Sequence, residues 1–224
     1  MADKKTQGKF ITFEGGEGSG KTTQSKMLFD ALNKSGIPTI YTREPGGTDG
    51  AEAIRKLLVE GETGRWDKIT ETLLFFAARH DHVEKLIKPS LARGEWVICD
   101  RFTDSTLAYQ GYGHGMSIEV INGMHKLTLG DFEPDATYIF DIDYEAGVKR
   151  ARAREDNIVH KKKEDRYERM ESIFHKNVRR GFLEIAKKNE ERCEVLDASL
   201  SINEIHNALI SRVNFRFQTK IRTV

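Results

Sequence analysis

Five short runs of β-branched and aromatic residues recur along the chain. They occupy residues 10–13, 38–41, 96–99, 137–142 and 194–196, and the longer stretches between them have helical period. Runs of this length and composition predict buried strands. Strands that alternate with helices form a parallel sheet covered by helices on both faces. The pattern therefore predicts an α/β fold.

One long amphipathic stretch, residues 70–91, has two distinct faces. The face expected to pack on the sheet carries Leu73, Phe76, Val83 and Ile87. A second face carries Thr72, Phe75, Arg79 and His82. Phe75 and Arg79 are four residues apart, so they can point together into a cleft. Core packing is an equal alternative for Phe75, because aromatic residues at helical spacing usually fill interiors.

The length of 224 residues predicts a single domain that spans residues 1–224. The chain has no internal repeat, no low-complexity tract and no Pro/Ser-rich linker. Its one compositional anomaly is the densely charged segment 150–169. We interpret this segment as a mobile lid rather than as a boundary between domains.

Charge and cysteine usage describe the setting in which the protein works. Lys and Arg total 36 and Asp and Glu total 35, so a net charge of +1 favours neither a nucleic acid nor a membrane as partner. Cys99 and Cys193 lie in apolar runs, which indicates buried thiols in a reducing compartment. No stretch approaches the roughly 20 apolar residues of a membrane span, and the N-terminus lacks an apolar signal core. We expect a cytoplasmic protein.

The strongest motif follows the first predicted strand. Gly15, Gly20, Lys21 and Thr22 fill the pattern G-x-x-x-x-G-K-[ST], with a predicted helix after it. Glycines let backbone N–H groups curl around phosphate oxygens, and the helix adds the positive end of its dipole. Lys21 is expected to neutralise the β- and γ-phosphates of ATP, and Thr22 to bind Mg²⁺. The predicted ATP-binding residues are Gly15, Gly16, Glu17, Gly18, Ser19, Gly20, Lys21, Thr22 and Thr23.

This loop alone leaves a kinase, a GTPase, an ATPase motor and a nucleotide-regulated binding protein open. Two further segments follow the second and third predicted strands, TREPGGT at 42–48 and DRFTDSTLAYQG at 100–111. Ligands of open parallel sheets bind at the carboxyl ends of strands. Asp100 is there a candidate for the Mg²⁺ shell, although an Asp in this position can also cap a helix.

The segments FEGGEGSGKTT, TREPGG, LFFAARHDHVEKLIKP, DR-x-x-x-S-x-x-AYQG and LGDFEPD occur in this order. Together they resemble the thymidylate kinase family over nearly the whole chain. The resemblance implies a three-layer P-loop NTPase-type sandwich whose five parallel strands have the order 2-3-1-4-5. It also implies a homodimer that phosphorylates dTMP to dTDP with ATP and Mg²⁺ in dTTP biosynthesis.

The resemblance also implies an acceptor site. Phe75 would stack on the thymine ring and Arg79 would approach the base, while Arg55 and Arg101 would bind the acceptor phosphate. Tyr109 would crowd a ribose 2′-hydroxyl and so favour deoxynucleotides. The predicted dTMP-binding residues are Glu14, Glu44, Arg55, Phe75, Arg79, Arg101, Ser105, Tyr109 and Gln110. For Glu44, a turn carboxylate without a ligand is the alternative.

Phosphoryl transfer commonly needs an arginine that supports the charge on the group in flight. The loop interior has no basic residue before Lys21, so this cation is expected from the lid, an arrangement that resembles the bacterial branch of the family. Arg154 is the first candidate and Arg166 the second. The predicted catalytic residues are Lys21, Arg101, Arg154 and Arg166. The lid lysines 161–163 are expected to be solvated.

Two alternatives for the function stay open at the sequence level. One is a kinase for another nucleoside monophosphate or for a deoxynucleoside, and the other is a P-loop module that binds nucleotide without phosphorylating a small molecule. A metal site at His80 and His82 is not expected, because residues two apart on a helix face different ways.

Overall fold

The centre of the molecule is a parallel sheet. The computed structural model describes residues 8–60, 64–155 and 170–222, and the side chains of 152–155 are outside that description. Its strands are β1 (Phe10–Gly15), β2 (Thr39–Arg43), β3 (Trp96–Asp100), β4 (Ala136–Asp141) and β5 (Cys193–Asp197). All neighbours are parallel, in the order β2-β3-β1-β4-β5. The predicted fold class and strand order are therefore confirmed.

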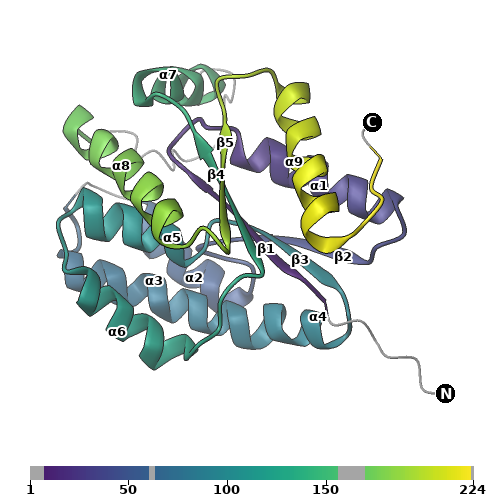
Figure 1. Ribbon diagram of the computed structural model, residues 1–224. Coiled ribbons are helices and arrows are strands. Elements are labelled where there is room, and N and C mark those ends of the chain that lie inside the picture. The colour runs from purple at the N-terminus through teal and green to yellow at the C-terminus, as the bar shows by residue number, and fades with distance from the viewer. Residues whose placement is uncertain (1–7, 61–63, 156–169, 223–224) are drawn as a thin grey trace.

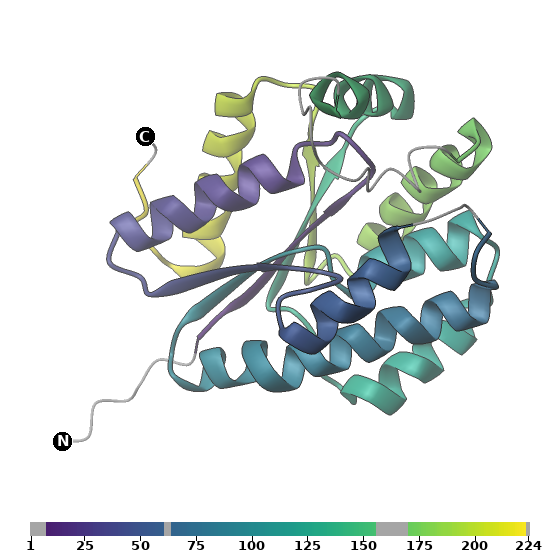
Figure 2. The same ribbon diagram turned by 180° about the vertical axis from the view of Figure 1, so that it is seen from behind.

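Helices cover both faces of this sheet (Figures 1 and 2). One face is covered by α1 (Lys21–Lys34) and α9 (Ile202–Phe217). The opposite face is covered by α2 (Asp49–Val59), α3 (Lys68–His82), the π-helical turn η1 (Val83–Ile87), α4 (Lys88–Ala92), α5 (Thr103–Thr106), the π-helical η2 (Leu107–Gly113), α6 (Ile118–Leu129) and α8 (Ser172–Lys188). Helix α7 (Tyr144–Glu155) lies at the carboxyl edge of the sheet, where the strand ends meet.

The strands alternate their side chains between two apolar layers, as their pleat requires. Phe13 and Ile11 pack with Leu28 of α1 and Leu209 of α9. On the other face Phe10, Val97 and Cys99 pack with residues of η1, and Ile139 packs with α8. The sheet is thus buried on both sides, so the carboxyl edge is where a ligand can approach it.

Helix α3 corrects one sequence prediction. Phe76 is buried, but Leu73, which was assigned to the same packed face, is 52% exposed. The polar face of the helix explains the difference, because Arg79 and His82 are themselves buried. The buried arc of α3 is therefore centred on its polar face, and Leu73 lies outside that arc, on the exposed side of the helix.

Two further sequence features have structural counterparts. Cys99 and Cys193 are free thiols, and both are buried. Within the described parts of the chain, no helix combines the length and the apolar character needed to cross a membrane.

Candidate active site

The phosphate loop joins β1 to α1. Its nine predicted ATP-binding residues run from the last strand residue into the first turn of the helix: Gly15, Gly16, Glu17, Gly18, Ser19, Gly20, Lys21, Thr22 and Thr23. Gly20 precedes the helix with φ 91°, a left-handed conformation that suits glycine. The N-terminus of α1 therefore points its N–H groups towards the space in front of the loop.

Lys21 is folded back onto the loop. Its Nζ donates to the Gly16 carbonyl oxygen at 2.7 Å and to the Ser19 hydroxyl at 3.3 Å. Burial, and then the positive charge of Arg101, lower the pKa of Lys21 to about 8. A phosphate beside the amine would favour its charged form. The lysine is thus suited to an anionic ligand.

The two residues predicted to bind Mg²⁺ are in contact. The Thr22 hydroxyl donates to Asp100 Oδ2 at 2.5 Å, across the gap between α1 and the end of β3. Hydroxyl and carboxylate oxygens suit Mg²⁺, which is usually held by one or two protein oxygens together with phosphates and water. In the described ranges no group of three or more His, Cys, Asp and Glu residues could hold a metal. The Thr22 and Asp100 oxygens fit an ion that arrives with the phosphates of a nucleotide.

The Arg101 side chain contacts several parts of the site at once. Its backbone has φ 73°, a left-handed conformation that is strained for arginine. The guanidinium donates to the Gly15 carbonyl oxygen at 3.1 Å and to the Ser105 hydroxyl at 3.1 Å. It also contacts Glu17 at 2.8 Å and the Tyr109 hydroxyl at 3.2 Å. One side chain thus links the phosphate loop to α5 and η2.

Glu17 belongs to the phosphate loop, and its side chain contacts Arg101 and η2. Its carboxylate accepts from Arg101 and, at 2.7 Å, from the Tyr109 hydroxyl. Burial would raise the pKa of Glu17, but Arg101 and Lys21 outweigh burial and hold it at about 2. The carboxylate is therefore charged, and it lies against the Tyr109 hydroxyl.

Glu14 at the end of β1 is fully buried. Its two carboxyl oxygens accept from the Phe102 N–H at 2.7 Å and from the Ser105 hydroxyl at 2.5 Å. Burial, and then the negative charge of Asp104, raise the pKa of Glu14 to about 8. Glu14 therefore holds the N-terminus of α5, the helix that contains the predicted acceptor residue Ser105.

One cavity gathers most of the predicted acceptor residues. It is lined by Glu17, Glu44, Pro45, Arg55, Val59, Phe75, Arg79, Arg101, Phe102, Ser105, Thr106, Tyr109 and Gln110. Of the nine predicted residues, Glu14 alone is not in this lining. Phe75 is half-buried and faces the cavity, so the alternative of full core packing does not apply to it. Two residues of the second helical face predicted for 70–91, Phe75 and Arg79, thus line this cavity, whereas Thr72 and His82 are not in its lining.

Arg79 is held rigidly within this cavity. Its Nε donates to Glu44 at 2.6 Å, and its Nη2 donates to the Phe102 carbonyl oxygen and to the Thr106 hydroxyl. The remaining Nη1 is buried and has no hydrogen-bond partner among the described residues. A buried donor without a partner is costly, so a ligand acceptor would satisfy it.

A second cavity lies in front of the phosphate loop. It is lined by Glu17, Gly18, Gly20, Lys21, Thr22, Lys26, Tyr41, Arg43, Glu44, Arg55, Asp100 and Arg101. Arg55 and Arg101 line both cavities, together with Glu17 and Glu44. Two arginines at the junction of two cavities can bind phosphates that approach each other from opposite sides. The geometry suits transfer of a phosphoryl group across that junction.

Comparison with known proteins identifies this arrangement. The family model described as thymidylate kinase matches residues 13–209. The chain belongs to the thymidylate kinase family. A thymidylate kinase of Caulobacter vibrioides is 47% identical over 204 residues, which cover 91% of this chain and 95% of that protein. A thymidylate kinase of Bradyrhizobium sp. is 45% identical and covers 96% of this chain and 93% of its own length. The crystal structure of thymidylate kinase from Ehrlichia chaffeensis superposes with a TM-score of 0.72 at 40% identity, and covers 92% of this chain and 99% of its own.

Part of the lid predicted for this thymidylate kinase family member lies outside the described residues. Arg166 and lysines 161–163 are among the residues that the structure does not describe. The backbone of Arg154 belongs to α7, but its side chain is not described. Arg150, at the start of the predicted lid, is described. It donates to the Ala198 carbonyl oxygen at 2.8 Å and so anchors α7 to the loop after β5.

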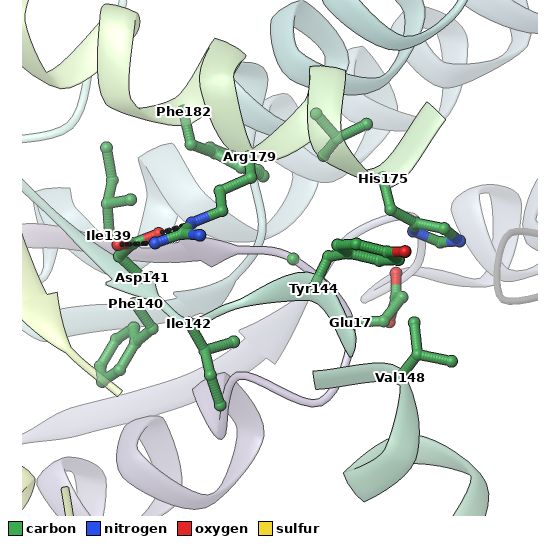
Figure 3. Close-up of a pocket in the computed structure, with 12 residues that line it drawn as sticks. Glu17, Ile139, Phe140, Asp141, Ile142, Tyr144, Val148, His175, Arg179 and Phe182 are labelled. Atoms are coloured by element: carbon green, nitrogen blue, oxygen red, sulfur yellow. Dashed lines mark hydrogen bonds and ion pairs between the residues drawn. The ribbon is translucent and has the colours of Figure 1, made fainter. Parts of the chain in front are cut away.

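Helices α7 and α8 flank the phosphate loop (Figure 3). The guanidinium of Arg179 in α8 forms a bidentate ion pair with the Asp141 carboxylate at the end of β4, with N–O distances of 2.7 and 2.9 Å. The Tyr144 ring stacks on His175 with centroids 6.3 Å apart, beside Glu17. These contacts join α8 to the end of β4 and the start of α7 to α8, beside the phosphate loop.

Sequence reasoning missed several residues of the site. Glu17 was assigned to ATP, and only the fold shows that its side chain reaches the acceptor cavity. Thr106 and Phe102 were missed because they lie inside the recognised 100–111 segment without a distinctive chemistry. Arg43 and Lys26 line the phosphate-loop cavity. Their basic character near strand and helix ends was the available signal.

Proposed function

We propose that the protein transfers the γ-phosphoryl group of ATP to dTMP and so forms ADP and dTDP. The observation that carries this proposal is the junction of the two cavities at Arg55 and Arg101, with Phe75 and Arg79 lining one cavity and the phosphate loop lining the other. The names of the relatives support dTMP as the acceptor. A base on Phe75 would direct its phosphate towards the junction.

The chain contributes positioning and charge stabilisation to this reaction. Lys21 and the loop N–H groups bind the donor phosphates, and Arg101 with Arg55 orients the acceptor phosphate. Thr22 and Asp100 would hold Mg²⁺, which would supply positive charge to the donor phosphates. The acceptor phosphate is already an anion at neutral pH, so this chemistry needs no general base.

The acceptor cavity suits a thymine nucleotide. The ring of Phe75 offers a stacking plane, and Arg79 Nη1 offers a donor to a base carbonyl oxygen. Tyr109 is held by Arg101 and Glu17, so its ring is a fixed wall that would crowd a 2′-hydroxyl. We further propose that Arg154 or Arg166 supplies a positive charge to the group in flight when the lid closes.

A homodimer is also proposed. Helices α2 and α3 lie against each other, and both expose large apolar side chains: Leu57 at 37%, Ile69 at 53% and Leu73 at 52%. Exposed apolar side chains grouped in this way commonly mark protein–protein contacts. We also place the protein in the cytoplasm, in keeping with its two free buried thiols.

The proposed reaction is tested by measuring ADP release from ATP and Mg²⁺ with and without dTMP. The Lys21→Ala variant is the control, and its turnover is expected to fall at least about 100-fold, because a fixed charge on the phosphates is lost. ADP release that needs dTMP and Lys21 supports the proposal. Nucleotide binding without acceptor-dependent ADP release would instead favour a nucleotide-binding module.

A further inference from the structure

The amide of Gln110 is held by a carboxylate that does not reach the acceptor cavity. Gln110 belongs to η2, is 1% exposed and lines the cavity. Its Nε2 donates to Glu71 Oε1 at 3.0 Å. The Glu71 side chain comes from α3, is 3% exposed and is not part of the cavity lining. A buried carboxylate outside the cavity lining therefore holds the side chain of a residue in that lining.

Chemistry fixes the orientation of this amide. A glutamine side chain has a donor end and an acceptor end, and in isolation either end can face a ligand. Gln110 turns its NH₂ group towards Glu71, because Nε2 is the atom that donates to the Glu71 carboxyl oxygen. Its carbonyl oxygen is then the end directed away from Glu71. Burying a carboxylate is costly unless it is well hydrogen-bonded, so its presence here calls for a role.

We propose that Glu71 is a specificity-determining positioning residue for the acceptor base. It holds Gln110 so that the amide oxygen accepts from the N3–H group of a 4-keto pyrimidine. A cytosine has a lone pair at N3, which would meet that oxygen with repulsion. This proposal rests on the proposed function and deepens it, because it assigns the selection of 4-keto over 4-amino pyrimidines to a residue outside the cavity.

Arg79 offers a second hydrogen-bonding group for the base edge in the same cavity. Its Nη1, which has no hydrogen-bond partner in the described part of the chain, is a donor suited to the 4-keto oxygen, and its Nε donates to Glu44. A donor at position 4 and an acceptor at position 3 match the edge of thymine and uracil. The edge of cytosine carries these two groups in the reverse order. Two buried carboxylates, Glu44 and Glu71, thus fix the two groups that would read the base edge.

The test compares dTMP with 5-methyl-dCMP, which has the same methyl group and the reversed edge. Dissociation constants are measured by NMR titration for the wild type, Glu71→Gln and Glu71→Asp. Thr72→Ser is the matched control, because Thr72 is the neighbouring buried residue on α3 and bonds to Lys68 and Met116 instead. Glu71→Gln keeps the shape of the side chain but can donate as well as accept, so Gln110 can turn over.

The preference for dTMP over 5-methyl-dCMP is expected to fall about tenfold in Glu71→Gln, the effect of one mispaired hydrogen bond. Glu71→Asp keeps an acceptor-only group and should retain most of the preference, and Thr72→Ser should retain all of it. An unchanged preference in Glu71→Gln overturns the proposal, and so does equal weakening of both nucleotides, since that indicates a purely structural role. A wild type that does not bind dTMP would contradict the proposed function itself.

Discussion

The carboxyl group of Glu14 links proton binding to folding at the scale of a single residue. Its pKa is about 8 in the folded protein, because of burial and then Asp104, against 4.5 for the free group. Between these values the folded chain keeps a proton that the unfolded chain releases. Stability therefore falls as pH rises through this range, by the linkage of proton binding to unfolding.

Glutamine at position 14 has no group that titrates in this range. Its amide oxygen can still accept from the Phe102 N–H, and the side chain can still contact Ser105. We expect the difference in Tm, variant minus wild type, to increase steadily from pH 5 to about pH 8. Thermal unfolding followed by circular dichroism in matched buffers measures it. A difference that stays constant across this range would show that Glu14 does not retain its proton in the folded state.

Arg101 should not tolerate lysine. Its guanidinium makes several directed contacts at once, to Gly15, Glu17, Ser105 and Tyr109, and a lysine amine cannot reproduce that fork. We expect kcat/KM for dTMP to fall about 100-fold or more in Arg101→Lys. The exposed Arg93→Lys serves as control in the same steady-state assay. Near wild-type activity in Arg101→Lys would remove Arg101 from the proposed mechanism.

The individual residues of the site were predictable to different degrees. Spacing alone placed Phe75 and Arg79 on one face, and the structure confirms that both line one cavity. The same spacing led to the wrong prediction that Leu73 is buried. It could not indicate that the polar side chains of α3, Arg79 and His82, are the buried ones. The partnership of Glu71 with Gln110 joins residues 39 apart in sequence, so no local pattern could indicate it.

At the scale of elements, α7 and the phosphate loop meet through two glycines. A Cβ on Gly147 would lie 2.5 Å from the Glu17 carbonyl oxygen, and one on Gly18 would lie 1.9 Å from the Gly147 carbonyl oxygen. Both neighbours are backbone atoms, which cannot rotate aside. Helix α7, in which the predicted lid begins, is therefore in direct contact with the loop that is proposed to hold ATP.

Gly147→Ala should separate α7 from the loop, with a destabilisation of about 1–3 kcal/mol from overpacking and weaker ATP binding. Gly123→Ala is the matched control, because Gly123 is an exposed glycine within α6 and a Cβ there would meet nothing within 4 Å. The control should gain about 0.5–1 kcal/mol from helix propensity. Urea unfolding measures both variants, and equal stabilisation of the two would refute the close contact.

The elements themselves followed closely from the sequence. Each strand begins and ends within two residues of its predicted run, because β-branched runs buried on both faces leave little ambiguity. The helix expected at 70–91 is interrupted by the π-helical turn η1. Such a turn depends on tertiary packing rather than on local propensity, so periodicity could not predict it.

At the scale of the whole molecule, the proposed dimer predicts a charge-sensitive interface. Leu73 is exposed, so Leu73→Glu should leave the fold intact but should disrupt a contact made through α2 and α3. The control is Phe215→Glu in α9, on the opposite face of the sheet, where Phe215 is 89% exposed. Light scattering after size-exclusion chromatography should find a wild-type dimer, a Leu73→Glu monomer and a Phe215→Glu dimer. A wild-type monomer, or a Leu73→Glu dimer, would refute this interface.

The two cavities together are proposed to transfer a phosphoryl group from ATP to dTMP. The most direct test is a competition in one tube, with ATP, Mg²⁺ and equimolar dTMP, dUMP, UMP, dCMP, dGMP and AMP, in which the nucleoside diphosphates are identified by mass spectrometry. The initial rates give the relative kcat/KM values for all acceptors at once. We expect dTDP to form fastest by a wide margin. Faster formation of any other diphosphate would contradict the acceptor site described for Phe75, Arg79 and Tyr109.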